Sequence, residues 1–203
     1  MVTLPARRAR ALPDRLCRDA RVLFVGINPG LRSARLGHHF AGRGNPFWRL
    51  LHAARFTPRA FTFADDGRLP ALGLGLTNIV PRATRSAAKI ASGEYDRGRR
   101  ALAQTIRRVR PGVVAFVGVT VYRQFFGSRA GGGCGPKPER IGAARVFVVP
   151  NPSGRNAAYP GFCDKLVWYR RLARHADRAR PIGSPRGDGR GNRSTPGRER
   201  AAR

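Results

Sequence analysis

The sequence predicts an α/β protein in which a mostly parallel sheet of about four strands lies between layers of helices. Four short, continuous apolar runs are spaced along the chain, and such runs are typical of strands that are covered on both faces. Helical patterns lie between and after these runs. Strands that alternate with helices imply right-handed crossovers between parallel neighbours, as in a three-layer α/β/α sandwich.

The predicted strands follow from the apolar runs. The first run, at 21–27, is preceded by charged residues and ends at an Asn-Pro-Gly turn. The other three runs are at 74–80, 113–118 and 146–149. The segment 127–138 contains five Gly and two Pro, so we expect a flexible loop there.

The predicted helices are marked by start signals and apolar stripes. Asn45 is suited to cap a helix, Pro46 is suited to its first position, and the apolar residues that follow recur at helical spacing. Further helices are predicted at about 94–108, directly after Gly118, and at about 164–177. Each presents an apolar stripe that can pack on the sheet.

The chain divides into three parts. Residues 1–20 form a basic lead-in, and 21–178 form one domain, since 203 residues suggest a single α/β unit. The tail at 179–203 has no aromatic residue and is rich in Arg, Gly, Ser and Pro. It cannot bury enough apolar surface to order itself, so we expect disorder. The tail either adds non-specific affinity for a polyanion or is a solvated tail without a role.

The charge of the chain indicates a polyanionic partner. The sequence has 40 Lys and Arg against 11 Asp and Glu, a formal net charge of +29. A body this positive attracts polyanions, with nucleic acid as the first candidate and an anionic membrane surface as the second. No apolar run approaches the roughly 20 residues of a membrane span, so we expect no membrane partner.

Three scattered cysteines exclude several classes of protein. Cys17, Cys134 and Cys163 are too few and too far apart for a disulfide scaffold, a CxxC metal site or an iron–sulfur cluster. We therefore expect free thiols in a reducing cytoplasm, with no metal. The basic N-terminus leaves an organellar presequence open, although Asp14 and Asp19 count against one.

Two of the strand ends resemble each other. The first run leads into Gly-Ile-Asn-Pro-Gly at 26–30, and the last leads into Pro-Asn-Pro-Ser-Gly at 150–154. Ligands of open parallel sheets bind beyond the carboxyl ends of the strands, where such tight turns offer free N–H groups and carboxamides. The two turns are either halves of one ligand site or ordinary turns that end strands.

A series of short motifs adds a specific resemblance. The turn at 26–30 is followed by Phe40-Ala41, Asn45-Pro-Phe-Trp48, Gly-Leu-Thr-Asn-Ile-Val at 75–80 with Arg82-Ala-Thr84, and the turn at 151–154. In this order the chain from about 21 to about 176 resembles the mismatch-specific uracil-DNA glycosylases, which belong with thymine-DNA glycosylase in the uracil-DNA glycosylase superfamily. The resemblance implies an α/β/α sandwich that excises uracil from double-stranded DNA, chiefly opposite guanine, without metal or cofactor.

By this resemblance Asn28 is the catalytic residue. Its carboxamide oxygen can hold a water against the anomeric carbon of the sugar, but an amide is no useful base near neutral pH. Catalysis would therefore depend on positioning and on stabilisation of the leaving base. Related enzymes carry Asp in this loop and His in the last one, where this chain has Asn28 and Asn151, so we expect a slower enzyme.

The resemblance also implies a base pocket. Phe40 matches the aromatic residue on which the flipped pyrimidine stacks, although a plain core Phe stays open as an alternative. Backbone N–H groups near Ile27 and Phe40 are suited to recognise the base carbonyls, and Asn78 matches a pocket asparagine. His38 and His39 precede Phe40, but adjacent side chains point apart, so we expect no catalytic role for them.

The last loop is expected to enter the duplex. Asn151, Ser153, Gly154, Arg155 and Asn156 match the residues that fill the gap left by the flipped nucleotide and contact phosphate. Related bacterial sequences commonly have Leu at the position of Arg155. A planar guanidinium can stack and donate to guanine, so Arg155 is either the plug or a simple phosphate contact.

Together these features predict a monomeric, cytoplasmic and monofunctional DNA glycosylase. Its expected substrate is uracil, with thymine or other modified pyrimidines as further candidates, opposite guanine in double-stranded DNA. A non-catalytic basic DNA-binding module of the same fold is the main alternative, and it would bind DNA without producing an abasic site. A nucleotide-binding enzyme of another α/β type is the third, although the chain has neither a GxGxxG nor a Walker loop.

Overall fold

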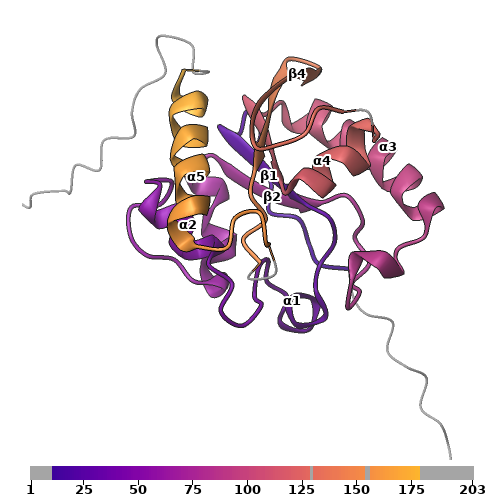
Figure 1. The fold of residues 1–203 in the computed structure, drawn as a ribbon, viewed down its shortest axis with the longest axis horizontal. Coiled ribbons are helices and arrows are strands. Elements are labelled where there is room, and N and C mark those ends of the chain that lie inside the picture. The colour runs from indigo at the N-terminus through magenta and orange to yellow at the C-terminus, as the bar shows by residue number, and fades with distance from the viewer. Residues whose placement is uncertain (1–10, 129, 154–155, 179–203) are drawn as a thin grey trace, which may run out of the picture.

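The computed structural model describes residues 11–128, 130–153 and 156–178. They form a five-stranded sheet with the strand order β2-β1-β3-β5-β4, and helices cover it (Figure 1). The strands are β1 (Val22–Gly26), β2 (Leu74–Asn78), β3 (Val113–Val117), β4 (Gly135–Ile141) and β5 (Ala144–Val149). β2, β1, β3 and β5 are parallel, and β4 pairs with β5 in the antiparallel direction at one edge.

The four predicted strands are confirmed, but the sheet has five strands rather than about four. The additional strand, β4, makes the prediction of a flexible loop over 127–138 wrong for 135–138. Gly and Pro conceal this strand in the sequence, and an edge strand tolerates them because only one side is paired. Its register on β5 shifts between Lys137 and Arg140.

Two helical layers cover the sheet and confirm the three-layer α/β/α class. On one face, α2 (Phe47–Ala53) and α5 (Phe162–Asp177) pack on residues such as Val22 and Phe24. On the other face, α3 (Ser92–Val109) and α4 (Val119–Phe126) pack on Leu23 and Val25. Figure 1 shows the two pairs of helices on opposite sides of the strands. Because side chains alternate along a strand, each apolar run fills both halves of the core.

Shorter helices were absent from the sequence-based prediction. The short helix α1 (Leu31–Leu36) begins directly after the Asn-Pro-Gly turn and buries only Ser33, so it has no apolar stripe to reveal it. The 3₁₀ helices η1 (Phe63–Arg68), η2 (Pro70–Leu72) and η3 (Ala87–Lys89) lie in connections. The sequence predicts Asn45 as the cap and Pro46 as the first residue of α2, but in the structure Pro46 is the N-cap and the helix begins at Phe47. Asn45 still serves the helix start, because its Oδ1 accepts a hydrogen bond from Phe47 N at 3.0 Å.

The described part of the lead-in joins the fold. Arg15 N donates to Leu76 O at 2.9 Å and Leu76 N donates to Arg15 O at 2.7 Å, so this segment extends the hydrogen bonding of β2. Leu12 and Ala20 are buried. The predicted tail at 179–203 lies outside the described residues. No helix in the described ranges combines the length and the apolar character needed to cross a bilayer.

Candidate active site

A cavity of about 370 Å³ lies at the carboxyl ends of the parallel strands. It is lined by segments that follow β1, β2 and β5 and by Val117 at the end of β3. Six of the site residues predicted from the sequence line this cavity, namely Ile27, Asn28, Phe40, Asn78, Asn151 and Ser153. The fold therefore brings together segments that are more than a hundred residues apart, at the sheet edge where ligands are expected.

The carboxamide of Asn28 is held in one orientation. Its Nδ2 donates to Thr84 Oγ1 at 2.8 Å, to Pro29 O at 3.1 Å and to Arg82 O at 3.2 Å. Carbonyl oxygens only accept hydrogen bonds, so the NH₂ group must face them and Oδ1 must face the other way. In the cavity wall, this oxygen is available to orient a water molecule.

Thr84 is a site residue that the sequence analysis did not assign. Its Oγ1 accepts from Asn28 and donates to Ser86 O at 2.8 Å, and the side chain is buried. Its backbone N also donates to Pro29 O at 3.2 Å. The sequence contains Thr84 in a recognisable motif, but no spacing rule connects it to an asparagine 56 residues earlier.

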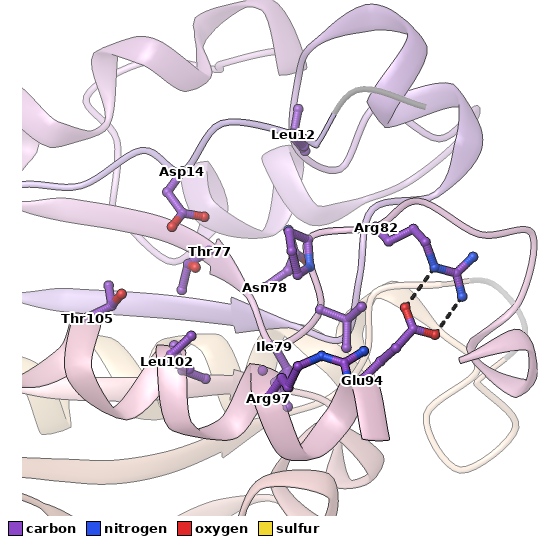
Figure 2. A pocket seen from close by; sticks show the side chains of 14 residues that line it. Leu12, Asp14, Thr77, Asn78, Ile79, Arg82, Glu94, Arg97, Leu102 and Thr105 are labelled. Atoms are coloured by element: carbon purple, nitrogen blue, oxygen red, sulfur yellow. Dashed lines mark hydrogen bonds and ion pairs between the residues drawn. The ribbon is translucent and has the colours of Figure 1, made fainter. Parts of the chain in front are cut away.

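An ion pair supports the same segment from outside. Arg82 Nε and Nη2 each donate to a carboxylate oxygen of Glu94 (Figure 2), and both distances are 2.7 Å. Arg82 Nη2 also donates to Lys89 O at 3.0 Å. Glu94 Oε1 accepts from Ala91 N at the start of α3. Hydrogen bonds from Arg82 and Ala91 N lower the pKa of Glu94 to about 2, so the pair is charged across the physiological range.

A second pocket adjoins the cavity on the α3 side. Its volume is about 360 Å³, and it shares Leu12 and Asn78 with the cavity that Asn28 lines. Figure 2 shows the side chains of Thr77 and Asn78, at the end of β2, opposite Leu102 and Thr105 of α3. Asn78 thus lies in the wall between two hollows.

Gly26 makes room for Asn78. The two residues are paired across β1 and β2, and a Cβ added at Gly26 would lie 2.5 Å from Asn78 Oδ1. Real Cβ atoms do not approach an oxygen this closely, so any larger residue at 26 would displace the Asn78 side chain. Gly26 therefore shapes the pocket wall at Asn78.

Phe40 has the geometry of a stacking platform. Its ring stacks on Phe47 with centroids 3.8 Å apart and an interplanar angle of 16°. Phe47 covers one face of the ring, and Phe40 as a residue is half-buried and lines the cavity. This arrangement leaves a surface on which a planar base can stack.

The two histidines before Phe40 make structural contacts. His38 Nδ1 lies 3.0 Å from Asp66 Oδ1, and His39 Nε2 lies 3.0 Å from Pro13 O. His39 is buried, and burial lowers its pKa, which favours the neutral ring. His39 also lines the cavity, and the expectation that neither histidine is a general acid or base stays a prediction.

The last loop is held by its own residues. Asn151 Oδ1 accepts from Ser153 N at 2.9 Å, and Asn156 Nδ2 donates to Asn151 O at 3.1 Å. Asn151 and Ser153 line the cavity, and both also border a neighbouring pocket of about 340 Å³ that contains Asn156. Gly154 and Arg155 lie outside the described residues, so the proposed plug of the duplex stays a prediction.

Comparisons with known proteins point to one family. Residues 13–173 match the family model of the uracil DNA glycosylase superfamily. A Schizosaccharomyces pombe protein named G/U mismatch-specific uracil DNA glycosylase is 32% identical over 185 residues, which cover 82% of this chain and 57% of that protein. The chain therefore spans little more than half the length of this relative.

A solved structure is similar in fold. The solution NMR structure of a proposed uracil DNA glycosylase from Methanosarcina acetivorans matches with a TM-score of 0.54 and 20% identity. The match covers 83% of this chain and 98% of the other. At this level of identity the likeness concerns the α/β fold.

Proposed function

The chain belongs to the uracil DNA glycosylase superfamily, and from this premise we propose that it is a monofunctional DNA glycosylase for base-excision repair. It hydrolyses the N-glycosidic bond of uracil that is mispaired with guanine in double-stranded DNA, with thymine and other modified pyrimidines as further candidate substrates. The observation that carries the proposal is the fixed carboxamide of Asn28. Its Nδ2 donates to three acceptors, and the residue lines a cavity of about 370 Å³, a volume typical of ligand pockets.

The proposed reaction needs no side chain that acts as a general acid or base. Cleavage of the bond develops positive charge on the sugar and negative charge on the departing base. Asn28 Oδ1 holds a water below the sugar, and the rate gain comes from the positioning of that water and from donors to the base. Backbone N–H groups near Ile27 and Phe40 are the proposed donors, and Asn78 lies in the pocket wall beside them.

The flipped base is held by stacking. Phe40 offers the ring, and a base on an aromatic platform gains about 1–3 kcal/mol, which offsets part of the cost of unstacking it from the duplex. Asn151, Ser153 and Asn156 shape the loop that faces the duplex, and Arg155 is the proposed plug and contact to the opposite guanine. The net charge of +29 supports DNA as the partner.

The described residues of a single chain supply this cavity, which supports action as a monomer. We also propose a cytoplasmic location, in keeping with the three scattered cysteines, and DNA rather than a membrane as the polyanionic partner.

A panel of labelled duplexes tests the proposal. We expect the protein to release base from G·U duplexes fastest, with slower or no release from A·U, G·T and G·etheno-cytosine, and alkaline cleavage to reveal abasic sites. Binding that weakens with salt but yields no abasic product on any duplex would instead support the non-catalytic module of the same fold.

A further inference from the structure

Asp66 is a buried carboxylate that does not line the catalytic cavity. It lies in η1 and is 1% exposed. A charge is costly to bury unless it is paired and hydrogen-bonded. Asp66 satisfies that condition entirely through segments beside the cavity. Its Oδ2 accepts from the backbone N of His39 at 3.0 Å, and its Oδ1 lies 3.0 Å from His38 Nδ1 and 3.1 Å from Arg15 Nε.

Phe40, the residue after His39, has a strained backbone. Phe40 has a φ of 51°, in the left-handed region that residues with side chains avoid. Such strain persists only where the surroundings determine the conformation strongly. Asp66 holds the residue before Phe40, and on the other side Ala41 N donates to Ser33 Oγ at 3.1 Å while Ala41 O accepts from Arg32 Nε at 2.8 Å.

The lead-in contributes to the same anchor. Arg15 joins Asp66 to the loop a second time, because its Nη2 donates to Gly37 O at 3.1 Å. Pro13 O lies 3.0 Å from His39 Nε2. Since Arg15 is itself hydrogen-bonded to β2 through Leu76, the loop at 37–39 is tied to the sheet through Asp66 and Arg15.

We propose that Asp66 is a positioning residue for excision, because it fixes Phe40 in the orientation in which the ring can receive the flipped base. The inference rests on the proposed function and goes beyond it. Asp66 touches neither base nor sugar, so it acts only through Phe40. A carboxylate that merely stabilised the fold would affect excision in proportion to the unfolded fraction, whether or not Phe40 is present.

The first test compares two neighbouring carboxylates. Asp66→Asn removes the charge that holds Arg15 and His38, whereas Asp65→Asn makes the same chemical change in the same 3₁₀ helix, where the carboxylate caps η1 and pairs with Arg59. We expect Asp66→Asn to lower the single-turnover excision rate on a G·U duplex by about tenfold to a hundredfold, the range that a shift of about 1 Å can cost. The affinity for undamaged duplex should stay unchanged, and Asp65→Asn should keep the native rate.

A double-mutant cycle then asks whether the effect passes through Phe40. In a Phe40→Ala background, Asp66→Asn should change the excision rate by less than about twofold, since the platform it positions is gone. The same loss in both backgrounds, or an equal loss from Asp65→Asn, would overturn the proposal. If Asp66→Asn does not fold, Arg15→Gln, which removes one partner of Asp66, should give a smaller loss that likewise disappears with Phe40→Ala.

A measurement without catalysis separates this inference from the proposed function. In protein with labelled phenylalanine, the ring current of Phe47 shifts the NMR signals of the Phe40 ring, because the two rings stack. Asp66→Asn should move these signals and Asp65→Asn should not. Unchanged Phe40 signals in Asp66→Asn would refute the role of Asp66 even if the native protein excises uracil. Shifted signals would support that role even if the native protein excises no base, in which case only the proposed function fails.

Discussion

Asn-Pro turns end two of the parallel strands, and the two asparagines use their carboxamides in different ways. Asn28, after β1, donates from Nδ2 to Arg82 O and Thr84 Oγ1, which are 54 and 56 residues further along the chain. Asn151, after β5, accepts at Oδ1 from the backbone N of Ser153, only two residues later. One amide is oriented by the tertiary structure, and the other shapes its own turn.

This difference separates two roles that the sequence presents alike. A carboxamide fixed by a remote segment keeps its orientation when DNA binds, as the holder of a catalytic water must. A turn fixed by its own residues can move as a unit and adapt to the duplex. The structure therefore supports chemistry at the first turn and DNA contact at the second.

Removing the acceptor of Asn28 tests the first half of the comparison. Thr84→Val keeps the shape of the side chain but loses Oγ1, so Nδ2 retains only Arg82 O and Pro29 O. A hydrogen bond contributes about 0.5–1.5 kcal/mol, so the single-turnover rate should fall by up to about tenfold while duplex affinity holds. Thr105→Val, on α3 beside the second pocket, is the matched control and should keep the native rate. A native rate in Thr84→Val would mean that Thr84 does not orient Asn28.

Changing the last turn tests the second half. Asn151→Ala removes the acceptor for Ser153 N, so the loop loses one of its internal hydrogen bonds. We expect duplex affinity to weaken by a few-fold, within the range of about 1 kcal/mol for one hydrogen bond, with a smaller effect on the single-turnover rate. Titration of a labelled duplex measures the affinity. A loss confined to the excision rate would mean that Asn151 serves the chemical step, so that the two asparagines would not differ in role.

The ion pair behind Asn28 gives the smallest expected effect. The pKa of Glu94 is lowered to about 2, so its contribution to stability is fully present above its ordinary pKa of 4.5 and is lost as the pH falls through about 2. The difference in Tm between the native protein and Glu94→Gln should be constant above about pH 5 and shrink toward pH 2. A difference that does not vary with pH would show that the charge of Glu94 is not what supports the Arg82 segment.

The parallel part of the fold could be predicted because strands buried on both faces are continuous apolar runs. β4 and α1 could not, since the first is an edge strand that tolerates Pro136 and Pro138 and the second buries little besides Ser33. Short elements without an apolar stripe leave no period in a sequence.

Site residues that stand in local sequence motifs could be predicted, whereas residues that act through contacts with distant parts of the chain could not. Asn28 and Phe40 stand in recognisable motifs. Thr84 and Asp66 act on partners 56 and 27 residues away, and no spacing rule reports such contacts. Gly154 and Arg155, outside the described residues, keep their predicted roles untested.

If Asn28 serves the chemical step, its loss and the loss of Asn151 have opposite effects on rate and affinity. Excision under single-turnover conditions and affinity for a G·U duplex should be determined for Asn28→Ala beside Asn151→Ala. We expect Asn28→Ala to lose on the order of a thousandfold in rate with its affinity nearly native, while Asn151→Ala changes the rate by less than about threefold. Comparable rates for Asn28→Ala and the native protein would contradict this role of Asn28.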